Sequence, residues 1–306
     1  MKKLYPLLAA SAFLGSTLSA NLLVSESFDN YVNDQTVVGQ GPSTTGFTGN
    51  WSNTGGGLAS SVDYYPRSGG LSYVNYAPSS TSGSLEAFRS SGSHSGGAKR
   101  ISRSFDYSSP GTGDFFISFL FANNSTSAEG DTEFRFQAEG SENNDRDTRL
   151  SIDHSNNDIT IGTGGQAGAE TTQSGIAGTN LLIIRAIYDS DTNTSGNPNA
   201  GFYDRVEIWL NPEITASANP TLDDLGTPDV TGFGIMRNFD GGGNPMAFEQ
   251  FNFKHSLKSG DVVLDGLTIT NDLGDLIAIP EPGTYGLIFA GFATGLVFLR
   301  RLRKAK

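Results

Sequence analysis

Few stretches of this chain place acidic residues where they could catalyse a reaction together. Asp131 and Glu133 stand two residues apart at the start of an expected strand, without a third acid in a Glu-x-Asp-x-x-Glu run. A retaining glycosidase needs two carboxyl groups about 5 Å apart. Asp204 and Glu207 stand three apart, so on a strand they would point to opposite faces. The acids are therefore predicted to occupy solvated strand positions, and they do not predict a catalytic pair.

The three histidines are equally scattered. His94 lies in Ser/Gly-rich sequence, His154 lies beside a turn, and His255 follows Phe-Asn-Phe-Lys without the tyrosine signature of a polysaccharide lyase. Ser93 lies in Gly-Ser-His-Ser-Gly, which is not the Gly-x-Ser-x-Gly elbow that carries a nucleophile. We therefore expect no catalytic site. A secreted polysaccharide hydrolase or lyase with acids that are not visible in local sequence is the alternative.

One polar loop has the pattern of a calcium ligand set. Asp189, Asp191 and Asn193 place oxygen-bearing side chains at alternate positions, as calcium loops do. Thr194 stands where an EF-type loop needs glycine, and no acid closes the loop twelve positions along. The pattern predicts either a calcium site or a polar hairpin loop between two strands.

Trp209 is the candidate for stacking on a sugar. In the run Val206-Glu207-Ile208-Trp209-Leu210, the three aliphatic residues share one face of a strand and Trp209 lies on the other. If the aliphatic face is core, Trp209 points outward among polar neighbours. The other interpretation, which we favour, is that a loop covers it. Trp51 and the pair Tyr64-Tyr65 lie in loop-like sequence and are weaker candidates.

The middle of the chain is predicted to form strands throughout. Short apolar runs are separated by Gly, Ser, Thr and Asn clusters, and no long helical periodicity appears. Phe134 and Phe136 alternate with polar residues, whereas Leu181–Ile184 is apolar on both faces, as in the middle of a sandwich. Expected strands are Leu22–Phe28, Leu71–Tyr76, Ile101–Tyr107, Phe115–Ala122, Glu133–Ala138, Arg149–Asp153, Asp158–Gly162, Asn180–Asp189, Asp204–Leu210, Phe233–Arg237 and Val262–Thr270. This pattern predicts one all-β domain over residues 21–277, a two-sheet antiparallel jelly-roll sandwich.

The charge of the chain restricts its possible partners, and its lack of cysteine restricts how the fold can be stabilised. The chain has 20 basic and 32 acidic residues, and seven of the basic ones lie at its two ends. An acidic surface repels phosphates, so we expect no nucleic-acid partner. There is no cysteine, so no disulfide stabilises the fold and stability must come from a packed core.

The two ends of the chain are predicted to be sorting segments. Residues 1–20 combine Lys2-Lys3, an apolar run and small residues before Asn21, which is typical of a secretory signal peptide. At the other end, Pro280-Glu281-Pro282 precedes the uncharged run Gly283–Leu299. A helix of that length rises about 25 Å, whereas the hydrocarbon core of a membrane is about 30 Å thick. It can span the membrane if the Arg300 and Arg301 side chains extend to the interface. The basic residues that follow, Arg300, Arg301, Arg303 and Lys304, should stay cytoplasmic.

This tail, residues 279–306, resembles the PEP-CTERM sorting signal of exported bacterial proteins, the substrates of exosortases. The resemblance rests on Pro280, Glu281 and Pro282, the apolar span, and the basic end. It implies export through the Sec translocon, cleavage by signal peptidase, and transient anchoring in the inner membrane. Cleavage near the triplet by an exosortase would then leave the protein on the cell surface or in the extracellular matrix.

The middle of the chain is similar to exported jelly-roll proteins of the laminin-G/concanavalin type. The matching pieces are Glu26–Asp29, Gly46–Trp51, Gly69–Tyr73, Phe115–Leu120, Asp204–Pro212 and Val262–Ile269. Each is a strand pattern, so the resemblance implies a fold and no reaction. Together these observations predict a non-catalytic surface or matrix protein that has a structural role or associates with extracellular polysaccharide. A ligand-free matrix spacer is a second alternative to this reading.

Overall fold

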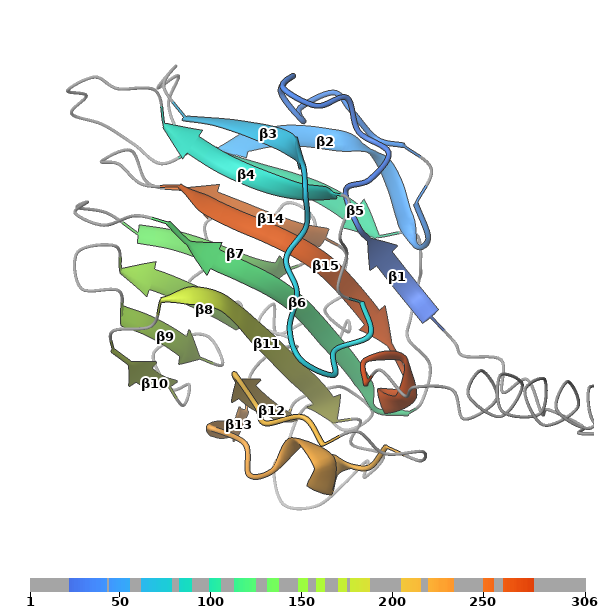
Figure 1. The fold of residues 1–306 in the computed structure, drawn as a ribbon, viewed down its shortest axis with the longest axis vertical. Helices are drawn as coiled ribbons and strands as arrows, with labels where there is room; N and C mark the ends of the chain where they lie inside the picture. The colour runs from blue at the N-terminus through green and yellow to red at the C-terminus, as the bar shows by residue number, and fades with distance from the viewer. Residues whose placement is uncertain are drawn as a thin grey trace, which may run out of the picture.

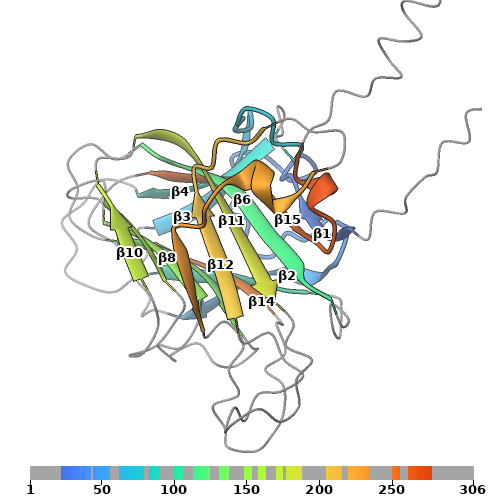
Figure 2. The same cartoon turned by 90° about the horizontal axis from the view of Figure 1, so that it is seen from below.

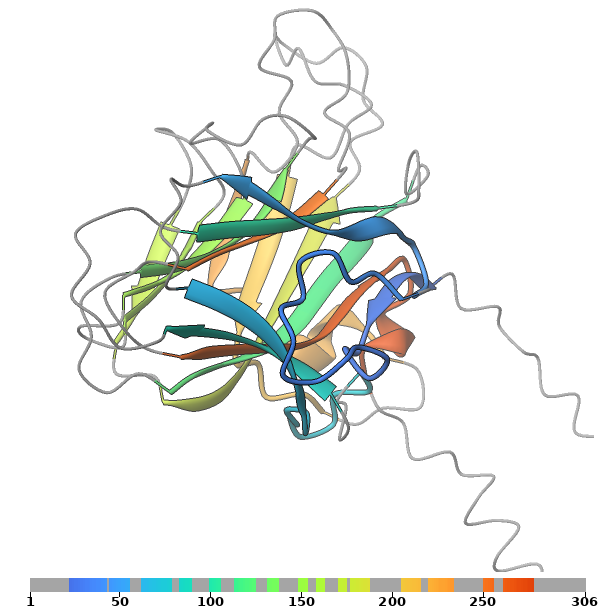
Figure 3. The same cartoon turned by 90° about the horizontal axis from the view of Figure 1, so that it is seen from above.

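The protein is an all-β, two-sheet antiparallel sandwich of the jelly-roll type, as the sequence predicts (Figures 1 and 3). The computed structural model describes residues 22–42, 44–55, 62–78, 83–89, 99–105, 113–124, 131–137, 148–153, 158–162, 170–174, 177–187, 205–215, 220–233, 250–255 and 261–277. Within these ranges there is no α-helix, and the two helical turns, η1 (Leu222–Leu225) and η2 (Leu273–Asp275), are short 3₁₀ segments.

The first sheet, sheet A, contains both the first and the last strand of the described chain. Its spatial order is β13 (Val230–Phe233), β12 (Arg205–Leu210), β11 (Gly178–Ile187), β6 (Phe115–Asn123), β15 (Val262–Thr270), β4 (Gly83–Arg89) and β3 (Val62–Ser68). β1 (Leu22–Glu26) pairs antiparallel with β15, with Leu22 opposite Thr270 (Figure 1). The chain therefore enters and leaves the fold at the same end of sheet A.

The second sheet, sheet B, packs against the first. Its order is β10 (Glu170–Gln173), β9 (Asp158–Gly162), β8 (Thr148–Asp153), β7 (Asp131–Gln137), β14 (Gln250–His255), β5 (Lys99–Phe105) and β2 (Phe47–Gly55). Every pairing between its strands is antiparallel. Figure 2 shows the two sheets as separate layers.

Aromatic side chains fill the space between the two layers. Phe119 of β6 faces Phe134 of β7 with ring centroids 5.0 Å apart, and Phe134 lies 4.7 Å from Phe253 of β14. All three rings are fully buried, at separations and tilts that favour aromatic pairs. The alternation predicted for Phe134 and Phe136 is confirmed, because both enter this core.

A second apolar cluster lies on the outer face of sheet A. Leu181 and Ile183 of β11 pack there with residues of the segments 71–78, 211–215, 220–225 and 273–277, whereas Leu182 and Ile184 pack between the sheets. Side chains alternate along a strand, so a strand covered on both sides must be apolar on both. This explains the run Leu181–Ile184 and confirms its predicted place inside the sandwich.

One long loop, residues 31–42, closes one side of the sandwich. Val37 donates its N–H to the Tyr64 carbonyl of edge strand β3 at 2.8 Å, and Gly39 donates to the Trp51 carbonyl of edge strand β2 at 2.9 Å. Within the loop, the Gln40 side chain accepts a hydrogen bond from the Val32 N–H and donates one to the Thr36 carbonyl. The loop thus occupies backbone groups at the edges of both sheets, which would otherwise be open to another chain.

Several predicted strand boundaries are confirmed and others are wrong. Asp158–Gly162 and Val262–Thr270 form strands as predicted, but Leu71–Tyr76 is a loop whose Tyr76 makes a single bridge to Ile277. Of the predicted strand Phe233–Arg237, only Phe233 is described, and it ends β13. Strands β2, β3, β4, β10 and β14 were not predicted, because polar and glycine residues interrupt their apolar positions.

Asp265 introduces a buried carboxyl group into β15. The side chain is fully buried and accepts backbone N–H groups from Leu71 at 2.7 Å and Gly266 at 2.6 Å. Burial raises the pKa of Asp265 to about 8, and the charges of Asp29 and Glu26 add to the shift. Because the folded-state pKa exceeds the unfolded one, this carboxyl contributes stability at low pH that is lost between about pH 4 and pH 8.

We therefore expect the melting temperature to fall as the pH rises from 5 to 9, and the Asp265→Asn variant to show a shallower fall. The amide loses one of the two backbone bonds, so this variant should melt below the wild type at pH 5, with the gap closing toward pH 9. Differential scanning calorimetry across this range measures both. Asp223→Asn, at an exposed position in η1, serves as the control. Parallel pH profiles for wild type and Asp265→Asn would contradict the assignment.

Candidate ligand-binding face

The predicted sorting residues lie outside the described part of the chain. This applies to the signal peptide, to Pro280, Glu281 and Pro282, to the span 283–299, and to Arg300, Arg301, Arg303 and Lys304. Among the residues that are described, no helix has the length and apolar character needed to cross a membrane. The sorting segments thus stay predictions from the sequence.

Of the two interpretations of Trp209, burial under loops is the one that the structure shows. The strand alternates as expected, with Val206, Ile208 and Leu210 in the inter-sheet core and Trp209 on the outer face of sheet A. That face is covered by loops, so Trp209 is only 2% exposed. Its indole N–H donates to the Gly226 carbonyl at 3.0 Å. The ring is part of the second apolar cluster, and a sugar cannot stack on it in this arrangement.

The other predicted candidates give no site within the described residues. Asp189, Asp191 and Asn193 lie outside them, as do His94 and His154. No group of three His, Cys, Asp or Glu side chains in the described ranges could hold a metal ion. Of the weaker aromatic candidates, Trp51 is buried in β2 and Tyr64 in β3, whereas Tyr65 is half-buried with the Arg67 guanidinium 5.3 Å from its ring centroid.

His255 and Glu207, which were considered for catalysis, both have partners within the fold. His255 is fully buried on the core side of β14, where its Nδ1 lies 2.6 Å from the Thr132 hydroxyl. It cannot reach an external substrate. Glu207 accepts from Arg185 at 2.8 Å on β12, which gives it a charge partner on the neighbouring strand.

The outer surface of sheet B, here called the polar face, is the feature that sequence reasoning missed. Phe251 and Phe253 of β14 point into the core, so Gln250, Asn252 and Lys254 lie on the opposite side. Cross-strand register extends this side to a set of polar residues on neighbouring strands. They are Ser52, Arg100, Ser102, Ser104, Glu133, Arg135, Ser151, Thr160 and Thr172. None of the outward positions on the described strands of sheet B is aromatic.

The centre of the polar face is withdrawn from solvent. Asn252 is fully buried, Gln250 is 3% exposed, and Ser102, which stands opposite Asn252, is 2% exposed. Neither the Oδ1 nor the Nδ2 atom of Asn252 has a hydrogen-bond partner, and the same holds for Nε2 of Gln250. Buried polar atoms are almost always paired in folded proteins, so two adjacent exceptions on one strand mark a functional candidate.

An ion-paired cluster borders these amides. Glu133 of β7 accepts from Arg135 Nε at 2.6 Å and from Lys254 Nζ at 2.7 Å, and it is 6% exposed. Glu133 is thus held in ion pairs with Arg135 and Lys254 on the same face of sheet B as Asn252.

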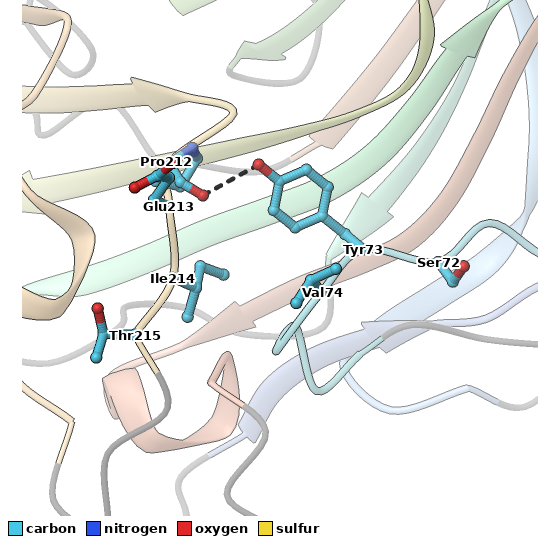
Figure 4. Close-up of a pocket in the computed structure, with 7 residues that line it drawn as sticks. All are labelled: Ser72, Tyr73, Val74, Pro212, Glu213, Ile214 and Thr215. Atoms are coloured by element: carbon cyan, nitrogen blue, oxygen red, sulfur yellow. Dashed lines mark hydrogen bonds between the residues drawn. The ribbon is translucent and has the colours of Figure 1, made fainter.

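A separate pocket of about 560 Å³ lies on the outer face of sheet A, between the segments 72–74 and 212–215 (Figure 4). The Tyr73 hydroxyl donates to the Pro212 carbonyl at 3.0 Å, and Asn75 Nδ2 donates to the Ile214 carbonyl at 2.9 Å. Burial and the Glu213 charge raise the pKa of Tyr73. Glu213 is the one carboxylate in the described lining, so the lining holds no pair of carboxylates.

Comparisons with known proteins concern the fold alone. No protein-family model and no curated protein matches the chain. Among solved structures, similar ones include a carbohydrate esterase from the Shiga toxin-encoding bacteriophage phi24B (TM-score 0.42, 10% identity, 82% of this chain and 98% of that chain). The globular domain of T. cruzi calreticulin matches with TM-score 0.42 and 10% identity over 74% of this chain and 85% of that one. The binding domain of botulinum neurotoxin serotype D/C matches with TM-score 0.38 and 9% identity over 83% and 50%.

Proposed function

We propose that this chain is an exported, exosortase-processed protein of the bacterial surface or extracellular matrix, whose β-sandwich associates with extracellular polysaccharide without cleaving it. The observation that supports polysaccharide binding is the polar face of sheet B, on which the side chains of Ser52 and Thr172 are exposed and those of Ser151 and Thr160 are half-buried. Sugars present dense arrays of hydroxyl groups, which both donate and accept hydrogen bonds. A face with accessible serine and threonine hydroxyls offers complementary groups.

Two further observations favour binding over catalysis. Glu133 is held between Arg135 and Lys254 at the centre of the polar face, whereas glycosidic bond cleavage needs a carboxylic acid with an available proton. His255, on the same strand as the amides, faces the core. The proposed export and anchoring rest on the sequence of the two ends, with the exosortase, the Sec translocon and signal peptidase as partners.

Calorimetric titration of the protein, purified from its host, with polysaccharide extracted from the same host tests the proposal. We expect saturable heat and no shortening of the polymer on size-exclusion chromatography. Shortening would indicate the alternative of a polysaccharide-active enzyme, and absence of heat would indicate a ligand-free spacer. Mass spectrometry of the same preparation tests processing, because a mature chain should end near Pro282 and a retained basic terminus would contradict it.

A further inference from the structure

The pocket on the outer face of sheet A contains an acid that the described part of the fold does not pair. Glu213 is exposed in the lining, and its carboxylate forms no ion pair or hydrogen bond with a described residue. By contrast, Glu26, Glu133 and Glu207 each pair with an arginine. A carboxylate that is accessible in a cavity can form a charge-assisted hydrogen bond with a cationic ligand.

The opposite wall of the pocket holds the backbone on both sides of this acid. The Tyr73 hydroxyl donates to the Pro212 carbonyl at 3.0 Å, reaching across the pocket (Figure 4). Asn75 Nδ2 donates to the Ile214 carbonyl at 2.9 Å. Glu213 is therefore attached to a fixed segment before any ligand arrives, which lowers the entropy lost on binding.

The rest of the lining is apolar, aromatic or hydroxylic. Val74 is 76% exposed, Tyr73 is half-buried and Ile214 is buried, and the exposed residues Ser72 and Thr215 add hydroxyl groups. Pockets that bind small molecules combine apolar and aromatic walls with a few polar groups, in volumes of about 300–1,000 Å³. The volume of about 560 Å³ found here falls in that range.

This lining restricts the chemistry of a ligand. A calcium ion takes six to eight oxygen ligands, whereas Glu213 is the one acid in the described lining, so a metal ion is poorly served. The same carboxylate repels an anionic ligand. A cationic group attached to an apolar body satisfies both Glu213 and the Val74 side of the pocket. A hexosamine without its acetyl group has both features, because it carries an ammonium on a ring whose C–H groups form an apolar face.

We propose that this pocket binds a de-N-acetylated hexosamine unit of a polysaccharide, with its ammonium on Glu213 and its ring against Val74, Tyr73 and Ile214. The inference rests on the proposed function and adds to it a second contact surface, on sheet A, with a stated ligand chemistry. A lysine side chain carries the same ammonium, but its linear chain would leave much of the pocket unfilled.

Calorimetric titration of the protein, purified from its host, tests this with three probes. They are a glucosamine tetrasaccharide, the same tetrasaccharide with every amine acetylated, and a tetralysine peptide. We expect the glucosamine tetrasaccharide to bind most tightly. The acetylated form should bind at least tenfold more weakly, because acetylation removes the positive charge.

Two substitutions test the pocket itself. Glu213→Gln should raise the Kd for the glucosamine tetrasaccharide about tenfold, because it removes a charge-assisted hydrogen bond. Val74→Lys should raise it at least as much, because it places a competing cation beside Glu213. Both positions are exposed, so the melting temperatures should stay within about 2 °C of wild type.

Asp34→Asn is the matched control. The chain has a formal net charge of −12, so it attracts any polycation to some extent. Asp34, on the loop 31–42, has a side chain that is 77% exposed and lies outside the described lining. Its replacement removes the same charge as Glu213→Gln, and this variant should bind like wild type.

The outcomes separate this inference from the proposed function. Wild type that binds polysaccharide from its own host but not the glucosamine tetrasaccharide overturns the inference alone, and wild type that binds neither overturns both. Equal Kd values for Glu213→Gln and Asp34→Asn would show attraction by net charge only and overturn the pocket. Equal binding of the acetylated tetrasaccharide overturns the role of the ammonium. Tighter binding of tetralysine overturns the sugar in favour of a basic peptide.

Discussion

Replacing Arg103 with methionine is expected to lower the free energy of unfolding by about 3–5 kcal/mol. The Arg103 guanidinium is buried and donates to Glu26 at 2.6 Å and to the Tyr31 hydroxyl at 2.6 Å. Tyr31 in turn donates to Glu26 at 2.6 Å and accepts from the Trp51 indole at 2.9 Å. Loss of the cation leaves the Glu26 carboxylate buried without its charge partner. Denaturant unfolding followed by tryptophan fluorescence measures the change.

A matched substitution at a more exposed ion pair provides the control. Arg185 bonds to Asp114 and Glu207 on the outer face of sheet A, and its side chain is 20% exposed. Arg185→Met should cost about 1 kcal/mol or less. Adding Glu26→Gln to Arg103→Met removes the unpaired charge and should restore part of the loss. Equal costs for Arg103→Met and Arg185→Met would show that the buried pair has no special role.

Gly46→Ala is expected to be the most disruptive single methyl addition in the N-terminal part of the fold. Gly46 has φ +75°, and a Cβ atom there would lie 1.8 Å from the Leu23 carbonyl oxygen and 2.8 Å from Val24 Cγ2. The first contact is with backbone of β1, so no side-chain rotation relieves it. We expect a loss of several kcal/mol, or no folded protein, measured by thermal unfolding and by the yield of folded chain.

Gly49 separates the steric effect from the backbone effect. It has φ +65°, and nothing lies within 4 Å of an added Cβ. Gly49→Ala should therefore cost only the strain of a left-handed residue, about 1–2 kcal/mol. If the two variants lose the same stability, the close packing of β1 against the turn at Gly46 is not what requires glycine there.

The architecture could be predicted from the sequence because its cause is local. Alternation at Phe134 and Phe136, and the two-sided apolar run Leu181–Ile184, follow directly from which faces are covered. The polar strands β2, β3, β4, β10 and β14 were not predicted, because a local pattern does not show which of their polar residues are buried. β14 reads Gln-Phe-Asn-Phe-Lys-His, and its outward amides are polar residues in a strand that is buried everywhere except at Lys254. Single-sequence patterns assign this combination to a loop or a surface.

The site was harder to predict because it depends on pairing between distant strands. Ser102, Asn252 and Arg135 stand in one row only because β5, β14 and β7 are neighbours in sheet B, although they come from three separate parts of the chain. Trp209 shows the opposite case. Its strand face was predicted correctly, but the loops that cover it come from segments whose position the local sequence does not specify. The alternation Phe-Asn-Phe in β14 was the available signal for an outward amide.

The position of the last strand also decides how the protein responds to mechanical load. β15 lies inside sheet A, bonded to β6 on one side and to β4 and β1 on the other. If the tail beyond Ile277 anchors the protein while sheet B holds a polymer, tension enters along the axis of β15. Hydrogen bonds between strands run perpendicular to that axis, so the load is shared as shear by many bonds at once. The single bridge between Tyr76 and Ile277 would release first, lengthening the tether while the sandwich stays intact.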